Sequence, residues 1–104
     1  MDLITGGLYQ GQDNFIKENY KSSLELYSFV RSELVKGLDE DAIASLVLSK
    51  EVEAVNALEI GAGMIPVDSF ERDLREVYGR IVCRLSKEAN KVIRMICGIA
   101  VVIK

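Results

Sequence analysis

The stretch LITGGLYQGQD, residues 3–13, joins a short apolar segment to a glycine-rich loop. Its first three residues are typical of a short strand, and the glycine pair behind them ends that strand. Asp13 stands where a helix N-cap is expected, with a sparse apolar face behind it, so we predict a helix over residues 13–20. A strand that runs through a glycine loop into a helix is typical of α/β proteins.

The rest of the chain continues this alternation. Ser22 and Glu25 have the spacing of a capping box, ahead of a helical apolar pattern that Gly37 ends. Asp39 and Asp68 are suited to cap two further helices. The predicted helices cover residues 23–36, 39–49 and 70–89, and the predicted strands cover residues 52–57, 92–97 and 99–103, the last two divided by Gly98.

This order of elements predicts an α/β fold with a small, mostly parallel sheet of about four strands flanked by helices, in one domain of residues 1–104. Ligands of such sheets bind at the carboxyl ends of the strands. In this chain those ends carry two glycine loops, residues 6–11 and 61–63. The two loops are therefore the predicted binding region.

Composition excludes several classes of function. Thirteen Lys and Arg against sixteen Asp and Glu give a net charge of −3, which argues against a nucleic-acid partner. The absence of histidine removes every mechanism with an imidazole acid, base or metal ligand. The longest apolar run, residues 92–103, is too short to span a membrane. With two cysteines, Cys83 and Cys97, and no leader at its start, we expect a cytoplasmic protein whose thiols act as small hydrophobes.

The first loop has the spacing of a phosphate-binding loop without its chemistry. Such a loop reads Gly, four residues, Gly, Lys, then Ser or Thr, and here Gly6 and Gly11 are followed by Gln12 and Asp13. Loss of the lysine removes hydrogen bonds to phosphate worth about 1.5 to 3 kcal/mol each. A carboxylate that caps the helix would also occupy the amides that receive a phosphate, and it would repel anions.

We therefore predict a degenerate loop with a structural role. The alternative is a loop that still binds GTP or ATP with magnesium. The residues predicted to contact such a nucleotide are Gly6, Gly7, Tyr9, Gln10, Gly11, Gln12 and Asp13.

Residues 3–11 and the second glycine segment, LEIGAGMIP at residues 58–66, together resemble the bifunctional adenosylcobinamide kinase and adenosylcobinamide-phosphate guanylyltransferase family of cobalamin biosynthesis. Spaced arginines, a Gly-Arg pair at positions 79 and 80, and a closing strand that ends at Lys104 extend the resemblance. It implies a P-loop NTPase-like fold and transfer of a phosphoryl and then a guanylyl group to adenosylcobinamide. Family members are longer, and their guanylylated histidine, loop lysine and its Ser or Thr neighbour have no counterpart here.

Two further groups of residues match the family. The second glycine segment supplies Glu59, Gly61, Gly63 and Pro66, and the following helix supplies Arg72, Arg75 and Arg80. Glu59 either contacts a magnesium ion or a ligand hydroxyl, or is solvated. The arginines either bind an anion at a subunit junction or pair with acidic neighbours at helical spacing. We assign no catalytic residue and no metal ligand.

Two functions stay open at this point. In the first, the chain is a shortened relative of this family with impaired catalysis, a pseudoenzyme. In the second, it is a non-catalytic assembly or interaction protein that retains only the scaffold and offers exposed sheet edges to its partners. The second function predicts a homo-oligomer, and a small-molecule nucleotide is the other candidate partner.

Overall fold

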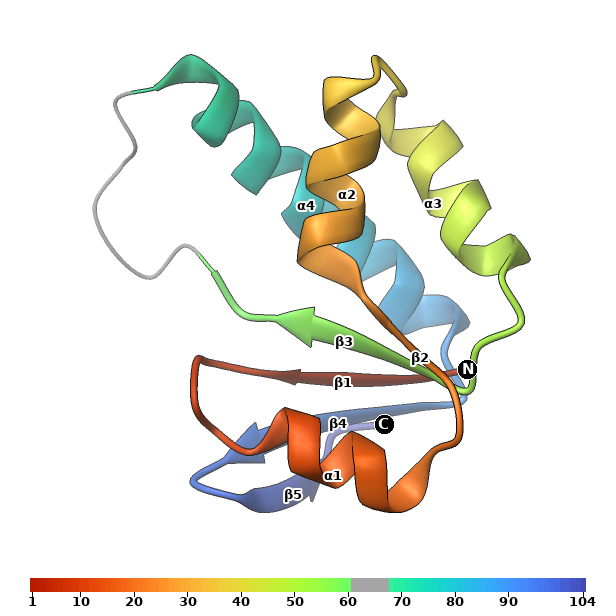
Figure 1. Ribbon diagram of the computed structural model, residues 1–104, viewed down its shortest axis with the longest axis vertical. Helices are drawn as coiled ribbons and strands as arrows, with labels where there is room; N and C mark the ends of the chain where they lie inside the picture. The colour runs from red at the N-terminus through yellow and green to blue at the C-terminus, as the bar shows by residue number, and fades with distance from the viewer. Residues whose placement is uncertain (61–67) are drawn as a thin grey trace.

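A computed structural model of the chain describes residues 1–60 and 68–104. It contains five strands and four helices in these residues, in the order β1-α1-β2-α2-α3-β3-α4-β4-β5 (Figure 1). The strands are β1 (Asp2–Gly6), β2 (Ser23–Glu25), β3 (Ala54–Leu58), β4 (Lys91–Ile96) and β5 (Ile99–Val102). The helices are α1 (Gln12–Asn19), α2 (Leu26–Val35), α3 (Glu40–Ser49) and α4 (Ser69–Glu88).

The strands form one sheet in the order β2-β3-β1-β4-β5. The first four are parallel, with Leu3 of β1 opposite Val55 of β3 and Val92 of β4. β5 runs antiparallel to β4 after a two-residue turn at Cys97 and Gly98. Both turn residues have positive φ, 49° and 79°, as a type I′ hairpin requires. The predicted α/β fold with a mostly parallel sheet is confirmed.

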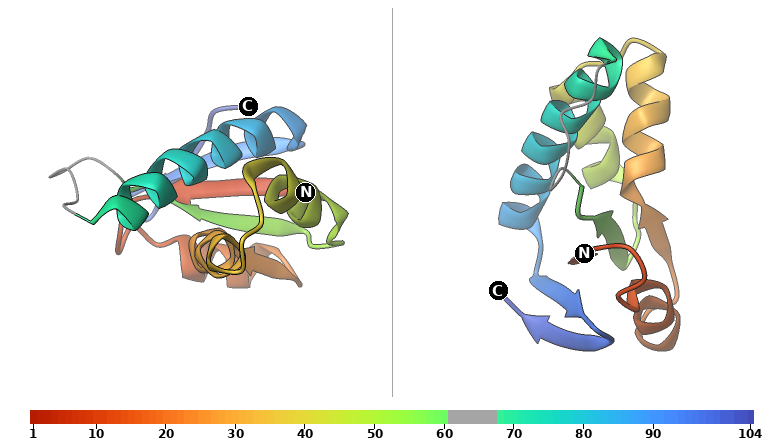
Figure 2. Two further views of the ribbon diagram at one scale, coloured as in Figure 1. Left: turned by 90° about the horizontal axis from the view of Figure 1, so that it is seen from above. Right: turned by 90° about the vertical axis from the view of Figure 1, so that its left-hand side faces the viewer.

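Helices cover both faces of the sheet (Figures 1 and 2). α2, α3 and α4 lie on one face, and α1 lies on the other. The cause is the alternation of side chains along each strand. Leu3 and Val92 point into the core beneath α2, α3 and α4, whereas Ile4 and Ile93 pack with Ile16 of α1. Strands covered on both faces carry consecutive apolar residues, as Leu3 and Ile4 of β1 and Val92 and Ile93 of β4 do.

Several predicted helix ends are confirmed. The Asp39 carboxylate accepts a hydrogen bond from the Ala42 N–H at 2.9 Å, and the Asp68 carboxylate accepts one from the Phe70 N–H at 2.8 Å. Each satisfies a backbone donor that the first helical turn leaves without a partner. Gly37 follows α2 with a φ of 95°, the left-handed conformation that commonly ends a helix.

The predicted second helix begins too early, because the sequence analysis missed β2. Leu24 lies opposite Val55 in a parallel pair, so the sheet has five strands in the described chain rather than about four. Glu25 is the N-cap of α2, and its carboxylate accepts hydrogen bonds from two N–H groups of the first turn. Ser22, the predicted cap, instead accepts a hydrogen bond from the Glu53 N–H at 3.0 Å.

The two cysteines are exposed, which corrects the expectation that they act as small hydrophobes. Cys97 was expected inside a strand, but β4 ends at Ile96 and Cys97 forms the hairpin turn. Cys83 lies on α4 between the buried Ile81 and Leu85, on a side of the helix that faces away from the core.

Candidate functional site

The carboxyl ends of β1, β2 and β3 lie next to one another and border a pocket of about 530 Å³. The glycine loop after β1 and the first turn of α1 form much of its wall. The structure therefore brings the predicted loop residues together at the edge of the sheet where ligands of α/β proteins bind. The predicted residues that line the pocket are Gly7, Tyr9, Gly11, Gln12 and Asp13.

Gln12 stands where a phosphate loop has its lysine, and its side chain turns back into the loop. It is only 5% exposed, and its Nε2 donates a hydrogen bond to the Gly7 carbonyl oxygen at 2.8 Å. Gly6 makes room for it, because a Cβ at that position would lie 2.9 Å from Gln12 Nε2 and from the Met95 carbonyl oxygen. The neutral amide is thus part of the internal structure of the loop.

Asp13 does not cap the helix, contrary to the prediction. The N-cap is Gly11, whose φ of 99° lets the helix begin one residue earlier, and no side chain accepts a capping hydrogen bond there. Asp13 lies in the first turn, and its Oδ1 accepts a hydrogen bond from Asn56 Nδ2 of β3 at 3.2 Å. The carboxylate therefore faces the pocket and leaves the helix amides uncovered.

The charge of the pocket is negative among the residues that the structure describes. Asp13 and Glu25 both line it, and no lysine or arginine does. Glu25 is held in place because it caps α2. Two carboxylates beside a loop without a cation disfavour a polyphosphate, since each repels the anion that the loop amides would attract.

Gln10 joins the loop to the hairpin and does not line the pocket. Its Oε1 accepts a hydrogen bond from the Cys97 N–H at 2.7 Å, and its backbone oxygen accepts one from the Gly98 N–H at 2.9 Å. A Cβ at Gly11 would lie 3.2 Å from the Gly98 Cα, so the loop and the turn are in close contact. Tyr9 has a φ of 60° and is almost fully exposed, which leaves it available to a ligand.

Glu59, at the start of the second predicted loop, is paired with an arginine of a neighbouring part of the sheet. It forms a two-point ion pair with Arg94 of β4, with Nε to Oε1 at 2.7 Å and Nη2 to Oε2 at 3.1 Å. These hydrogen bonds, followed by the coulombic attraction of Glu59, raise the pKa of Arg94. Sequence reasoning missed Arg94. The predicted residues Gly61, Gly63 and Pro66 lie outside the described residues.

Two arginines of α4, Arg80 and Arg84, pair with acidic residues of α3. Arg80 pairs with Glu40 of α3 and, at 2.8 Å, with Glu76 one turn earlier on α4. Hydrogen bonds to these two carboxylates raise the pKa of Arg80. The predicted alternative of acidic partners is therefore confirmed for Arg80. Arg72 is exposed and Arg75 is half-buried on the same helix.

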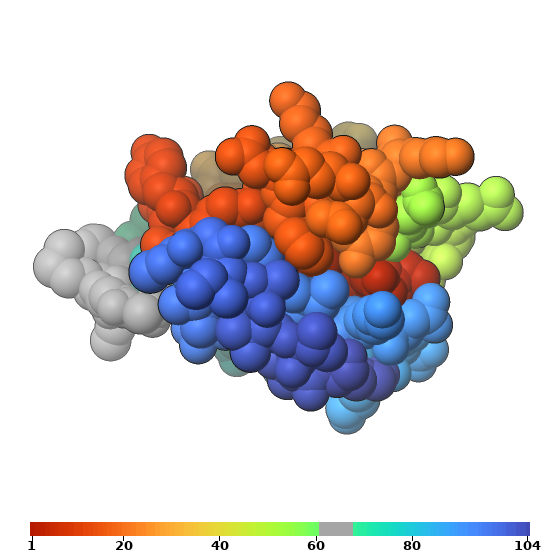
Figure 3. Space-filling model, turned by 90° about the horizontal axis from the view of Figure 1, so that it is seen from below, coloured from red at the N-terminus to blue at the C-terminus, as the bar shows by residue number. Residues whose placement is uncertain are grey.

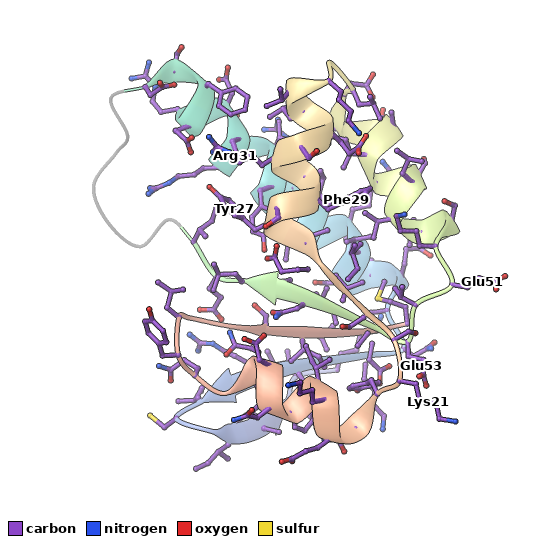
Figure 4. All side chains as sticks on the ribbon, viewed as in Figure 1. Lys21, Tyr27, Phe29, Arg31, Glu51 and Glu53 are labelled. Atoms are coloured by element: carbon purple, nitrogen blue, oxygen red, sulfur yellow. The ribbon has the colours of Figure 1, made fainter. Side chains whose placement is uncertain are left out.

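The contact between α2 and α4 also consists of an ion pair and packed aromatic rings. Arg31 of α2 pairs with Glu71 and lies 5.4 Å from the centre of the Phe70 ring. Tyr27 meets Tyr78 edge to face, with 5.4 Å between ring centroids. Figure 4 shows Tyr27 and Arg31 between α2 and α4, well away from the glycine loop. These ion pairs and rings hold helices together and do not contribute to the pocket.

A scan against protein-family models and a search of curated proteins found no match to this chain. Among residues 1–60 and 68–104, no helix is long and apolar enough to cross a membrane. The same residues contain no cluster of three or more Cys, Asp or Glu side chains that could hold a metal ion.

Proposed function

We propose that this chain is a shortened relative of the adenosylcobinamide kinase and guanylyltransferase family, with a P-loop-like arrangement in which catalysis is lost. Its support is the pair of glycine segments and the closing strand, together with a loop placed directly after β1 and before α1. The observation that carries the loss of catalysis is Gln12, a buried neutral amide bonded to the Gly7 carbonyl where a lysine would bind phosphate.

Phosphoryl transfer depends on charges that this site does not supply. The transition state of the reaction is stabilised by a cation that contacts the transferred phosphoryl group and by magnesium, which a loop hydroxyl helps to hold. Here Gln12 and Asp13 replace the cation and the hydroxyl. Since each 1.4 kcal/mol or so is tenfold in rate, losing two such interactions lowers turnover by several powers of ten.

A kinase assay with adenosylcobinamide and GTP or ATP with magnesium tests this proposal. We expect no product above that of a heat-denatured sample. Turnover of about 1 per second, ordinary for a kinase, would overturn the proposal. A covalent guanylyl adduct detected by mass spectrometry after incubation with GTP would overturn it equally.

The second candidate function is a non-catalytic assembly protein that forms homo-oligomers. One observation favours it: the outermost strand of the sheet, β5, is exposed along its whole length, and its residues are all apolar. Exposed apolar edge strands are sites of strand pairing between chains. This candidate is compatible with the first, because a scaffold that has lost its chemistry can retain a role in assembly.

A further inference from the structure

The β5 edge is the largest stretch of apolar side chains exposed in the described chain. We use this name for β5 together with Ile96 and Ile103, which flank it. Ile99, Val102 and Ile103 are 66%, 64% and 61% exposed, and Ile96 and Val101 are above 40%. Figure 3 shows the hairpin, in blue, open to solvent beside α1.

This edge lacks the usual protection against pairing. Natural edge strands carry charges, prolines or bulges that prevent a second strand from adding to them, and the sequence IAVV of β5 has none. The alternation of hydrogen bonds in an antiparallel hairpin fixes which backbone groups face outward. With Ile96 and Ile99 paired next to the turn, the N–H and C=O groups of Ala100 and Val102 lie on the outer side. Ile103 follows the same alternation, because its N–H points toward β4 and donates a hydrogen bond to the Val92 carbonyl oxygen at 2.8 Å.

We propose that the occupant of this edge is the β5 edge of a second copy, so that two sheets join in an antiparallel pair. The strand is self-complementary in one register. Ala100 of each copy lies opposite Val102 of the other, which pairs all the outward-facing backbone groups of the two strands. Val101 then faces Val101 of the second copy on the two-fold axis, and Ile99 faces Ile103 of the second copy. Every cross-strand side-chain pair is apolar, and such pairs stabilise a sheet.

The exposed area indicates a weak dimer. The apolar side chains of the edge expose on the order of 400 Å² per copy, at the upper end of what a monomer usually leaves uncovered. Two copies would bury less than the roughly 1,200 to 2,000 Å² of a standard stable interface. We therefore expect a dissociation constant in the range of about 1 to 100 μM. The inference rests on the assembly function proposed above and names its partner.

Sedimentation velocity from low to high micromolar concentration tests the dimer. The unmodified chain should shift from monomer to dimer over this range. Val101→Lys places two like charges opposite each other on the axis and should leave only monomer. Val35→Lys, at an exposed position on α2, is the matched control and should dimerise like the parent. A parent that stays monomeric throughout, or a dimer that Val101→Lys leaves unchanged, would overturn the proposal.

Cysteine cross-linking tests the register and remains decisive if Val101→Lys fails to fold. In a Cys83→Ser and Cys97→Ser background, Val101→Cys should form a disulfide between copies, because facing residues in a pair without hydrogen bonds are about 4.5 Å apart at Cα. Ile99→Cys alone should not cross-link, but it should do so when mixed with Ile103→Cys. Efficient cross-linking of Ile99→Cys alone, or none with Val101→Cys, would contradict the register.

The two proposals fail separately. Phosphoryl transfer by a dimeric chain would overturn the loss of catalysis and leave the β5 pairing intact. A monomeric chain without activity would overturn the assembly function and the pairing together, whereas a dimer that Val101→Lys leaves unchanged would overturn the β5 pairing alone.

Discussion

Replacing Gln12 by lysine and Asp13 by serine should turn the glycine loop into a phosphate-binding loop. The lysine supplies the missing cation at the start of α1, close to the Gly7 carbonyl that Gln12 now bonds at 2.8 Å. The serine removes the carboxylate that lies in the first turn and bonds Asn56. The helix amides need no rearrangement, since no side chain caps them in the parent structure.

The gain in affinity follows from these two changes. A charge-assisted hydrogen bond to phosphate contributes about 1.5 to 3 kcal/mol. The carboxylate and the incoming phosphate are both attracted by the positive end of the α1 dipole, so removing the carboxylate from the first turn adds about 0.3 to 1 kcal/mol to the binding free energy of the phosphate. The sum of about 2 to 4 kcal/mol corresponds to a 30- to 700-fold tighter complex, at roughly 1.4 kcal/mol per factor of ten.

Titration calorimetry with GTP and magnesium measures this gain. The control is Asp13→Ser combined with Asn14→Lys, which makes the same change in net charge at a neighbouring residue of the pocket wall without a lysine at the loop start. We expect binding by the first double variant and little by the control. Equal binding by both would show that net charge rather than loop chemistry is limiting. An unmodified chain that binds GTP as tightly as the variant with Gln12→Lys and Asp13→Ser would refute the reasoning.

Three further changes test other contacts. Gly6→Ala should lower the free energy of unfolding, measured by urea denaturation, by about 2 to 4 kcal/mol. The cause is that Gly6 has a φ of +153° and that the new Cβ would lie 2.9 Å from the Met95 carbonyl oxygen. An unchanged free energy of unfolding would contradict the packing around Gly6. Lys104→Met should lower the free energy of unfolding by about 1 kcal/mol, because the Lys104 Nζ donates hydrogen bonds to three carbonyl oxygens at the end of α4, the shortest of them 2.8 Å long. Thermal unfolding measures this loss, and an unchanged stability would show that those hydrogen bonds do not stabilise the fold. Burial and the hydrogen bond to Asp2 raise the pKa of Tyr20 to about 12. The folded state therefore keeps a proton that the unfolded state loses near pH 10, and the free energy of unfolding falls as the pH rises from 10 to 12. In urea titrations Tyr20→Phe should show a shallower fall than the parent, and an equally steep fall would count against this assignment.

Local sequence signals predicted most of the fold. Caps such as Asp39 and Asp68, and the terminating Gly37, act through backbone groups within a few residues, so their effect is visible in the sequence. Gly98 likewise marked the division between the two terminal strands, where the structure has a turn with a φ of 79°.

What the sequence could not predict depends on distant partners. β2 has only three residues, and Leu24 becomes a strand residue through its pairing with Val55 of β3. Its local spacing fits a helix equally well. The ion pair between Glu59 and Arg94 joins residues 35 positions apart, and no periodicity links them.

The glycine loop shows both outcomes at one site. The sequence alone shows that Gln12 and Asp13 stand at the positions where a phosphate-binding loop has a lysine and a Ser or Thr. The way in which the loop is filled was not evident. Asp13 was expected to cap the helix, whereas Gln12 occupies the loop interior and Asp13 bonds a neighbouring strand.

The backbone amides of residues 6–13 report most directly on whether the loop takes up a phosphate. Two-dimensional ¹H–¹⁵N NMR spectra of the unmodified chain, titrated with GTP and magnesium to millimolar concentration, would follow each amide and the Gln12 side-chain NH₂ group. We predict no saturable shift in these signals, with the Gln12 amide remaining on the Gly7 carbonyl. Saturable shifts confined to the loop amides and the first turn of α1 would contradict the central claim that this loop has lost its phosphate site.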